Sequence, residues 1–379
     1  MKNSIYLLAI LLCALLMPLA SCSKDSDEPQ VIAKRTLLVY MVASNSLASC
    51  DIDDVSEIEA SISANGLNDC RLLIYWVNNT SAPRLVEIVK KGSGTAQVVH
   101  KTYDEKIKST TQERMQMVIS DVFDTAPAND YGMILWSHAS GWASSLTARS
   151  TNASLMDFGD DRGTTMPIDV LADAIPENSF SFIYTDACYM AGIEVAYQLK
   201  DKTRYFMGSV TELPIDGMDY INNIPCFLAD EPDLIQCCKN TYEKYNKLYG
   251  SAKSCTISLI DCSKLDALAS ICKDIHMNGI KITNDYDIQK YKRTEPYLFY
   301  DFGQYTKLMA NESQVEEFNK AIADAVVYKA ATPYIFNSIK INPENYSGLS
   351  TYILGMSQPT SVNESYYKVL SWYNDVIKQ

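Results

Sequence analysis

Residues 36–42 read Thr-Leu-Leu-Val-Tyr-Met-Val, an uninterrupted apolar run rich in β-forming side chains. Such a run predicts a strand that is buried on both faces of a parallel sheet, since a half-exposed strand would alternate apolar and polar residues. Similar runs occur at 70–77, 132–137, 180–185 and 203–210, and a hairpin is predicted at 85–103. Segments with helical apolar spacing lie between them, at 54–64, 110–123, 168–174 and 193–199. This alternation predicts an α/β fold with a mostly parallel sheet and helices on both faces.

The pattern changes beyond residue 231, where amphipathic helices outnumber strands. Helices are predicted at 234–249, 263–277, 314–328 and 366–378, and strands at 254–260, 334–341 and 349–354. We therefore expect an α/β domain over 34–230 and an α+β subdomain over 231–379 that packs on its sheet.

The composition is that of a globular protein, because 47% of the 379 residues are hydrophobic and 21% are charged. These values exclude a disordered chain and a collagen-like repeat. Lys and Arg number 33 against 46 Asp and Glu, which gives a formal net charge of −13. Nucleic acid is not an expected partner, since its binding needs a basic surface. We expect a monomer.

The first 21 residues have the features of a secretory signal peptide, with a positive start and an apolar stretch over 5–16. The following Leu-Ala-Ser-Cys resembles the bacterial lipobox, which implies lipidation of Cys22. The acidic, flexible tether over 22–33 resembles the surface-export signal of Bacteroidetes lipoproteins. We therefore expect an outer-membrane lipoprotein, on the cell surface or the periplasmic face, held by acyl chains. The alternative is an ordinary signal peptide with a nearby cysteine.

The chain has 11 cysteines, of which Cys13 leaves with the signal peptide and Cys22 would be lipidated, so nine remain. An odd number leaves at least one free thiol unless pairing is intermolecular. No pair has C-x-x-C spacing and the three histidines are not clustered with cysteines, so a zinc site is not expected.

Two predicted strands end in chemically reactive side chains. His138 follows the strand at 132–137, and Cys188 follows the strand at 180–185. Because parallel strands deliver their carboxyl ends to one edge, the thiol and the imidazole should meet there as a nucleophile and its general base. The helix expected near residue 191 should lower the thiol pKa. Alternatively, the cysteine is a packing residue and the histidine an ordinary polar one.

The segments WSHASGW (136–142) and TDACYMAGIEVAYQL (185–199) resemble the clostripain-like cysteine peptidases of the caspase–gingipain–legumain clan. The resemblance covers roughly residues 36–220. It implies a caspase-like three-layer α/β/α sandwich, with residues 34–230 as the catalytic domain. It also implies that Cys188 is the nucleophile and His138 the acid/base.

Position 139 departs from the family pattern, which has glycine after the histidine where this chain has Ala139. If the glycine is needed for a positive φ, alanine would be strained by about 1 kcal/mol. If only its N–H is used, the backbone N–H groups of Ala139 and Cys188 still form the expected oxyanion hole.

The resemblance implies cleavage after Arg or Lys in peptide or protein substrates. Asp186 and Asp216 are then the acids of the primary specificity pocket, and paired carboxylates favour a guanidinium. The structural alternatives are a helix cap for Asp186 and an ordinary turn for Asp216.

The polar loop over 143–166 resembles a segment in which relatives undergo autocleavage. Arg149 is the better candidate for autocleavage and Arg162 the second. Three carboxylates in this loop, those of Asp157, Asp160 and Asp161, could bind calcium, although a solvated acidic loop is the alternative. No cofactor is required by the sequence.

These observations predict a cysteine endopeptidase that cleaves after Arg or Lys. The alternative is a catalytically degenerate member of the family that binds peptides or proteins at the surface, with Ala139 as its main support. A serine hydrolase is disfavoured because the chain has no Gly-x-Ser-x-Gly elbow.

Overall fold

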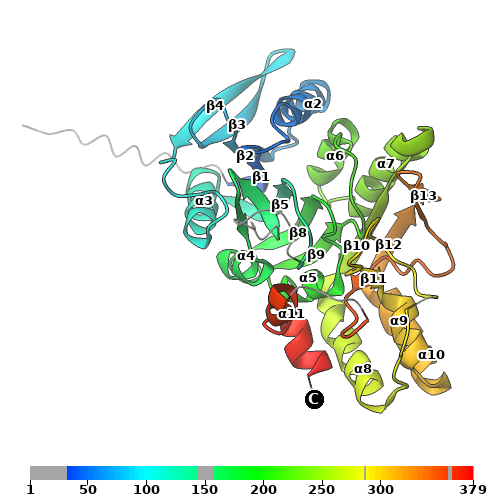
Figure 1. Ribbon diagram of the computed structural model, residues 1–379. Coiled ribbons are helices and arrows are strands. Elements are labelled where there is room, and N and C mark those ends of the chain that lie inside the picture. The colour runs from blue at the N-terminus through cyan, green and yellow to red at the C-terminus, as the bar shows by residue number, and fades with distance from the viewer. Residues whose placement is uncertain (1–31, 144–156, 286, 357–360, 379) are drawn as a thin grey trace, which may run out of the picture. The chain divides into compact units, whose positions relative to one another are not determined.

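The computed structural model describes residues 32–143, 157–285, 287–356 and 361–378, which belong to one compact unit. Its centre is a nine-stranded sheet with the order β12-β10-β9-β8-β5-β1-β2-β3-β4 (Figure 1). The strands are β1 (Ala33–Val42), β2 (Arg71–Val77), β3 (Arg84–Lys91), β4 (Gly94–Thr102), β5 (Ala128–Trp136), β8 (Phe180–Asp186), β9 (Thr203–Gly208), β10 (Thr256–Asp261) and β12 (Val326–Ala331). The neighbours β9, β8, β5, β1 and β2 are parallel, and the outer strands are antiparallel. The expected mostly parallel sheet is confirmed.

Side chains of β1 alternate between two buried cores, one on each face of the sheet. Leu38 and Tyr40 belong to one core, and Leu37 and Val39 belong to the other. Helices α3 (Gln112–Thr125), α4 (Ile168–Ala174), α5 (Ile193–Gln198), α8 (Leu265–Asn278) and α10 (Glu312–Ala325) pack in the first core, and α2 (Cys50–Asn65), α6 (Tyr220–Phe227) and α7 (Leu234–Asn246) in the second. The three-layer α/β/α sandwich is confirmed, and it explains why the strand sequence is apolar without interruption.

Shorter elements complete the described chain. They are β6 (Phe158–Asp161), β7 (Thr164–Met166), η1 (Gly250–Ala252), η2 (Cys262–Lys264), β11 (Tyr300–Asp301), α9 (Phe302–Met309), β13 (Tyr334–Ile335), β14 (Ile339–Lys340), β15 (Ser350–Thr351), α11 (Ser361–Tyr367) and η3 (Tyr373–Ile377). None of the helices in the described ranges is both long and apolar enough to cross a bilayer.

The C-terminal part of the chain extends the central sheet. β10 pairs with β9, and β12 pairs with β10 on the outer side, both antiparallel. Strands from both sides of the boundary predicted at residue 231 therefore share one sheet. The helix predicted at 314–328 is wrong at its end: α10 ends at Ala325, and the β-branched valines that follow begin strand β12.

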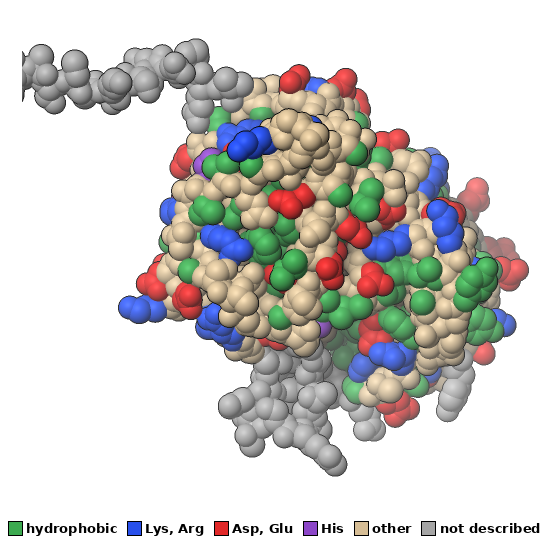
Figure 2. Space-filling model, turned by 90° about the horizontal axis from the view of Figure 1, so that it is seen from above, with side chains coloured by type: hydrophobic (Ala, Val, Ile, Leu, Met, Phe, Trp, Pro, Cys, Tyr) green, Lys and Arg blue, Asp and Glu red, His purple; other side chains and the backbone are tan. Residues whose placement is uncertain are grey.

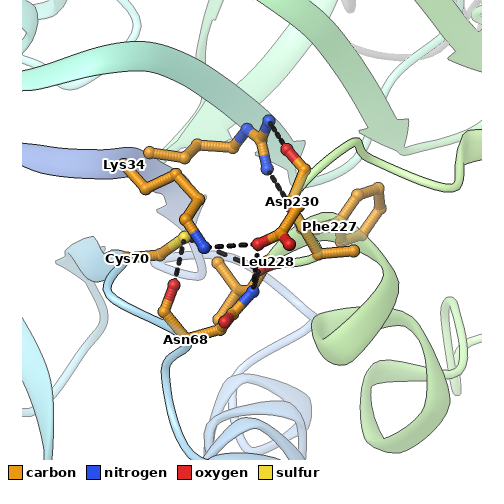
Figure 3. A network of polar contacts seen from close by, with 8 residues as sticks. Lys34, Asn68, Cys70, Phe227, Leu228 and Asp230 are labelled. Carbon is orange, nitrogen blue, oxygen red and sulfur yellow. Dashed lines mark hydrogen bonds and ion pairs between the residues drawn. The ribbon is translucent and has the colours of Figure 1, made fainter.

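Polar contacts fasten the start of β1 to the connection between α6 and α7 (Figure 3). The guanidinium of Arg35 donates to the carbonyl oxygens of Phe227 (2.9 Å) and Ala229 (2.8 Å), and the ammonium of Lys34 is paired with the carboxylate of Asp230. Asn68 donates to the carbonyl oxygen of Leu228 at 2.9 Å. Residues at the start of β1, together with Asn68, therefore hold the connection between α6 and α7 in place.

One face of the molecule is drawn in Figure 2 with its side chains coloured by type. Acidic, basic and apolar side chains are interspersed on this face, and lysine and arginine do not form one broad patch. The face therefore offers no continuous basic surface.

Candidate active site

The ends of β5 and β8 place the two reactive side chains at the same edge of the sheet. Trp136 of β5 is paired in register with Asp186 of β8. His138 and Cys188 each lie two residues beyond this pair, and both line one cavity of about 320 Å³. The expectation that thiol and imidazole lie at one site agrees with this geometry.

The imidazole of His138 is oriented by the segment between β1 and α2. Its Nε2 lies 2.8 Å from the hydroxyl of Ser46. The same segment is fixed by Asn45, whose amide donates to the carbonyl oxygens of Val42 (3.0 Å) and Asp160 (2.8 Å). Burial lowers the pKa of His138, and the charge of Asp160 partly opposes this. The lowered pKa favours the neutral imidazole, which is the form that can accept a proton from the thiol.

The thiol of Cys188 is partly exposed and accepts a hydrogen bond from the backbone N–H of Leu213 at 3.3 Å. Burial raises its pKa to about 11, although the Leu213 N–H acts in the opposite direction. The expectation that a helix dipole lowers this pKa was wrong. Burial is the dominant influence on this thiol, and helix α5 begins only at Ile193, five residues after Cys188.

Ala139 carries no backbone strain, because its φ is not positive; Gly141 adopts the positive φ of 64° instead. A Cβ at Gly141 would lie 2.6 Å from the carbonyl oxygen of Tyr189, so glycine is required there. The N–H groups of Ala139 and Cys188 donate to no acceptor in the described part of the chain. Both are available to an oxyanion.

Asp186 provides the carboxylate in the wall of the same cavity and is only 6% exposed. It accepts hydrogen bonds from the N–H of Met218 (3.0 Å) and the hydroxyl of Tyr220 (3.1 Å). Burial raises its pKa. Gly217 lies against it with φ 54°, and a Cβ there would come within 2.6 Å of a carboxylate oxygen. Asp186 therefore lines the cavity and does not cap α5, whose N-cap is Gly192.

The second acid expected in this pocket, Asp216, does not line the cavity. Its side chain is exposed, and its carbonyl oxygen accepts a hydrogen bond from Lys244 at 2.7 Å. Instead, the second acid that interacts electrostatically with Asp186 is Asp54 of α2, which accepts a hydrogen bond from the indole of Trp136 at 2.7 Å. Burial and the charge of Asp186 raise the pKa of Asp54 to about 8. The sequence showed Asp54 only as an acid in the first turn of a helix.

Three further residues of the cavity could not be found from the sequence. Glu212 and Arg293 form an ion pair at 2.5 Å, and the guanidinium of Arg293 lies 5.2 Å from the ring centre of Phe336. Arg293 and Phe336 come from the C-terminal part of the chain, far from the strand ends that predict the site.

The loop after His138 is described only in part. Arg149 and the lipidation candidate Cys22 lie outside the described residues. Arg162 occupies the tight turn between β6 and β7 with φ 53° and is ion-paired with Glu105 at 3.5 Å.

The three carboxylates expected as calcium ligands, those of Asp157, Asp160 and Asp161, do not form one metal site in the part of the chain that the structure describes. Asp161 is buried and accepts hydrogen bonds from Ser44 (2.7 Å) and from the N–H of Ser109 (2.8 Å). Asp157 is buried, and burial raises its pKa to about 8. Within the described ranges, no three His, Cys, Asp or Glu side chains form a group that could hold a metal ion.

Comparisons with known proteins agree with this geometry. The model of the clostripain family matches residues 39–376. No curated protein matches the chain.

Several solved structures are similar over nearly their whole length. An inactive zymogen C11 protease from Parabacteroides distasonis is 29% identical, covers 92% of this chain and 99% of its own, and superposes with a TM-score of 0.80. A secreted C11 cysteine protease from Bacteroides thetaiotaomicron, in complex with an irreversible peptide inhibitor, is 28% identical over 91% of this chain and 99% of its own, with a TM-score of 0.78. A clostripain from the same organism, bound to the peptide inhibitor BTN-VLTK-AOMK, is 29% identical over 57% of this chain and 97% of its own, with a TM-score of 0.51.

Proposed function

The chain belongs to the clostripain family of cysteine peptidases, and from this premise we propose that it hydrolyses peptide bonds after arginine, with lysine as the second choice. The observation that carries the proposal is the buried carboxylate of Asp186 in the wall of the cavity that Cys188 also lines. A carboxylate in that position attracts a cationic side chain of the peptide and thereby places the next peptide bond near the thiol.

Cys188 is the nucleophile of the proposed mechanism, and His138 moves the protons. The sulfur attacks the peptide carbonyl carbon while the imidazole takes the thiol proton, and the imidazolium then protonates the leaving amine. The negative charge on the carbonyl oxygen is stabilised by the N–H groups of Ala139 and Cys188. Water hydrolyses the resulting thioester and restores the thiol.

Arginine is preferred over lysine because a planar guanidinium can bind a carboxylate with two parallel hydrogen bonds. Trp136 and Pro214, which also line the cavity, provide apolar surface for the methylene groups of either side chain. The peptide VLTK of the inhibitor bound to the similar clostripain ends in lysine, which supports a basic residue at this position.

A protein that binds basic peptides without cleaving them is the second candidate. The raised pKa of Cys188 favours it, because a thiol is a weaker nucleophile than a thiolate. The two functions differ in the turnover of a fluorogenic peptide that contains arginine. The peptidase is supported if Cys188→Ala abolishes turnover and Cys50→Ala leaves it intact. Cys50 is the matched control because its thiol is also partly exposed. Saturable binding of the peptide without turnover supports the second function.

Autocleavage within 143–166 is part of the proposal, with Arg149 as the preferred position. Arg162 is the weaker candidate, because a tight turn cannot enter an active site as an extended strand. The similar protease from P. distasonis is described as an inactive zymogen, which supports an activation step. We expect the wild-type chain and Arg162→Ala to split into two fragments on a denaturing gel, and Arg149→Ala to remain intact. The same two fragments from Arg149→Ala would refute this assignment.

Membrane attachment through a lipid on Cys22 also belongs to the proposal, and it would place the enzyme at the outer membrane. Fractionation of cells that express the full chain tests it. The wild-type chain should sediment with membranes, and Cys22→Ala should not. Equal sedimentation of both would refute the anchor.

No cofactor takes part in the proposed mechanism. Both carboxylate oxygens of Asp161 already accept hydrogen bonds, from the hydroxyl of Ser44 and the N–H of Ser109, which disfavours Asp161 as a calcium ligand. Treatment with EDTA should leave peptide turnover unchanged, and a loss that added calcium restores would show that the metal is needed.

A further inference from the structure

Ser46 contacts the imidazole of His138 but lies outside the cavity that this imidazole lines. Its hydroxyl oxygen is 2.8 Å from Nε2 of the ring. The next residue along the chain, Leu47, reaches the cavity, whereas Ser46 does not. In the described part of the chain, the ring of His138 makes no other hydrogen bond. Nε2 is therefore occupied by Ser46, and Nδ1 is the nitrogen left for the thiol and the substrate.

The segment that carries Ser46 is held by strand β6. The side-chain amide of Asn45 donates to the carbonyl oxygen of Asp160 at 2.8 Å. One residue earlier, the hydroxyl of Ser44 donates to the carboxylate of Asp161 at 2.7 Å. The side chain of Ser46 is exposed, but the backbone that leads to it is thus fixed in place.

The same strand fixes the backbone of His138. The N–H of Gly159 donates to the carbonyl oxygen of His138 at 2.9 Å. The hydroxyl of Ser137 donates to the carbonyl oxygen of Val42 at 2.8 Å and accepts from the N–H of Asp160 at 3.2 Å. Because β6 holds both segments, the contact between hydroxyl and imidazole is set by the fold and is not a passing encounter of two surface side chains.

The direction of the hydrogen bond between Ser46 and His138 follows from the proton that the imidazole has to accept. A neutral imidazole has one N–H group and one bare nitrogen. If Ser46 donated to Nε2, Nδ1 would hold the proton, and neither nitrogen could take a proton from the thiol of Cys188. If Nε2–H donates to the oxygen of Ser46, Nδ1 is bare and can take it. The hydroxyl hydrogen of the exposed Ser46 is then free to bond to water.

We propose that Ser46 is a positioning residue that holds His138 in the tautomer with the proton on Nε2, so that Nδ1 exchanges protons with Cys188 and with the leaving amine. This assignment rests on the proposed peptidase function. As the sulfur of Cys188 attacks the carbonyl carbon, its S–H bond breaks and Nδ1 takes the proton. When the C–N bond of the tetrahedral intermediate breaks, Nδ1 gives this proton to the amine. Nε2 keeps its own proton throughout.

The hydroxyl of Ser46 also stabilises the charged form of the imidazole. After the thiol proton has been taken, both ring nitrogens carry hydrogen, and Nε2–H still donates to Ser46. A hydrogen bond from a charged donor is stronger than one from a neutral donor, so the contact stabilises the imidazolium more than the resting enzyme. Removal of the hydroxyl should therefore lower kcat. KM should hardly change, because Ser46 does not line the cavity.

Long-range ¹H–¹⁵N NMR of the resting full chain tests the tautomer without any turnover. A ring nitrogen that carries hydrogen and a bare one differ strongly in chemical shift, so the spectrum of the neutral ring shows which nitrogen holds the proton. The chain has three histidines, and the signals that disappear in His138→Gln belong to His138. We expect the proton on Nε2 in the wild-type chain and in Ser46→Thr, which keeps the hydroxyl. Ser46→Ala should give a mixture of both tautomers.

Steady-state kinetics on an arginine peptide tests the consequence for catalysis. We expect Ser46→Ala to lower kcat by about tenfold, the factor that one hydrogen bond can supply, and to change KM by less than about twofold. Ser46→Thr should restore most of kcat. Ser56→Ala is the matched control, since Ser56 is also exposed but its hydroxyl donates within α2, to the carbonyl oxygen of Ile52 at 2.7 Å. This variant should keep the kcat of the wild type.

A proton on Nδ1 in the wild-type chain would overturn the proposal, and so would a Ser46→Ala variant with unchanged kcat. If the wild-type chain does not cleave arginine peptides at all, the proposed function fails, whereas the spectrum still decides the tautomer. The wild-type chain and Ser46→Thr are sufficient for that decision if Ser46→Ala does not fold.

Discussion

Asp186 and Asp216 occupy very different environments although the sequence predicts both as acids of one pocket. Asp186 is buried and lines the cavity with Cys188, whereas Asp216 is exposed and lies outside the lining. The strand end places Asp186, because it pairs in register with Trp136. The position of Asp216 depends on how a loop folds, and a motif does not determine that.

Replacement of these two acids separates their roles. We expect Asp186→Asn to lower kcat/KM for arginine peptides by about 100-fold, since one partner of a buried charge pair is lost. Asp216→Asn should change it by less than about threefold, in line with an exposed charge. Steady-state kinetics on the two variants measures both. Similar losses of kcat/KM in both variants would show that Asp216 also belongs to the pocket.

Asp54 gives a prediction about stability and pH. Burial and the charge of Asp186 raise its pKa to about 8 in the folded chain, above the value of about 4 in an unfolded chain. The folded state therefore holds the proton more tightly, and the stabilisation is complete below about pH 4 and is lost as the pH rises through about 8.

Asp54→Asn should remove this dependence, because its amide stays neutral and can still accept from Trp136. We expect the midpoint of thermal unfolding of the variant to rise relative to wild type between pH 5 and pH 8, by roughly the few degrees that 1–2 kcal/mol produce. A difference between the two proteins that does not vary with pH would contradict the account.

At the scale of secondary-structure elements, the central strands were predictable and the edge strand was not. Residues 36–42 and 180–185 are buried on both faces, so their apolar character alone identifies them. β12 is an edge strand with partly exposed side chains, and its sequence continues a helical pattern from α10. Only its pairing with β10 decides its structure, and pairing over such a distance is not visible in one sequence.

Gly217 lies against the carboxylate of Asp186, so the conformation of its loop bears on the proposed specificity. Gly217→Ala should lose roughly 1 kcal/mol of stability from its positive φ, and its Cβ would also displace Asp186. Gly92→Ala is the matched control, since Gly92 has a φ of 58° in the β3–β4 turn with nothing within 4 Å of a Cβ. We expect similar shifts in thermal unfolding for both variants and a loss of arginine-peptide cleavage only for Gly217→Ala. Full cleavage by Gly217→Ala would show that this contact does not shape the pocket.

At the scale of the whole molecule, the site is built both from the ends of neighbouring strands and from residues in the C-terminal part of the chain. His138 and Cys188 could be placed from the sequence because parallel strands share a carboxyl edge. The raised pKa of Cys188 could not be predicted from the sequence, since it depends on burial by the surrounding chain. The loop at Leu213 also contributes, through its N–H. Arg293 and Phe336 reach the cavity from the C-terminal part, which continues the same sheet through β10 and β12.

Labelling with an arginyl chloromethylketone tests the central claim most directly, because the reagent needs a pocket for arginine and a reactive thiol at the distance of the scissile bond. Mass spectrometry of the labelled chain should find one adduct on Cys188. Excess arginine peptide should slow the labelling, and Asp186→Asn should slow it by about 100-fold. An unlabelled Cys188, or an adduct on Cys226 or Cys50 in its place, would contradict the assignment of this site as the centre of an arginine-directed peptidase.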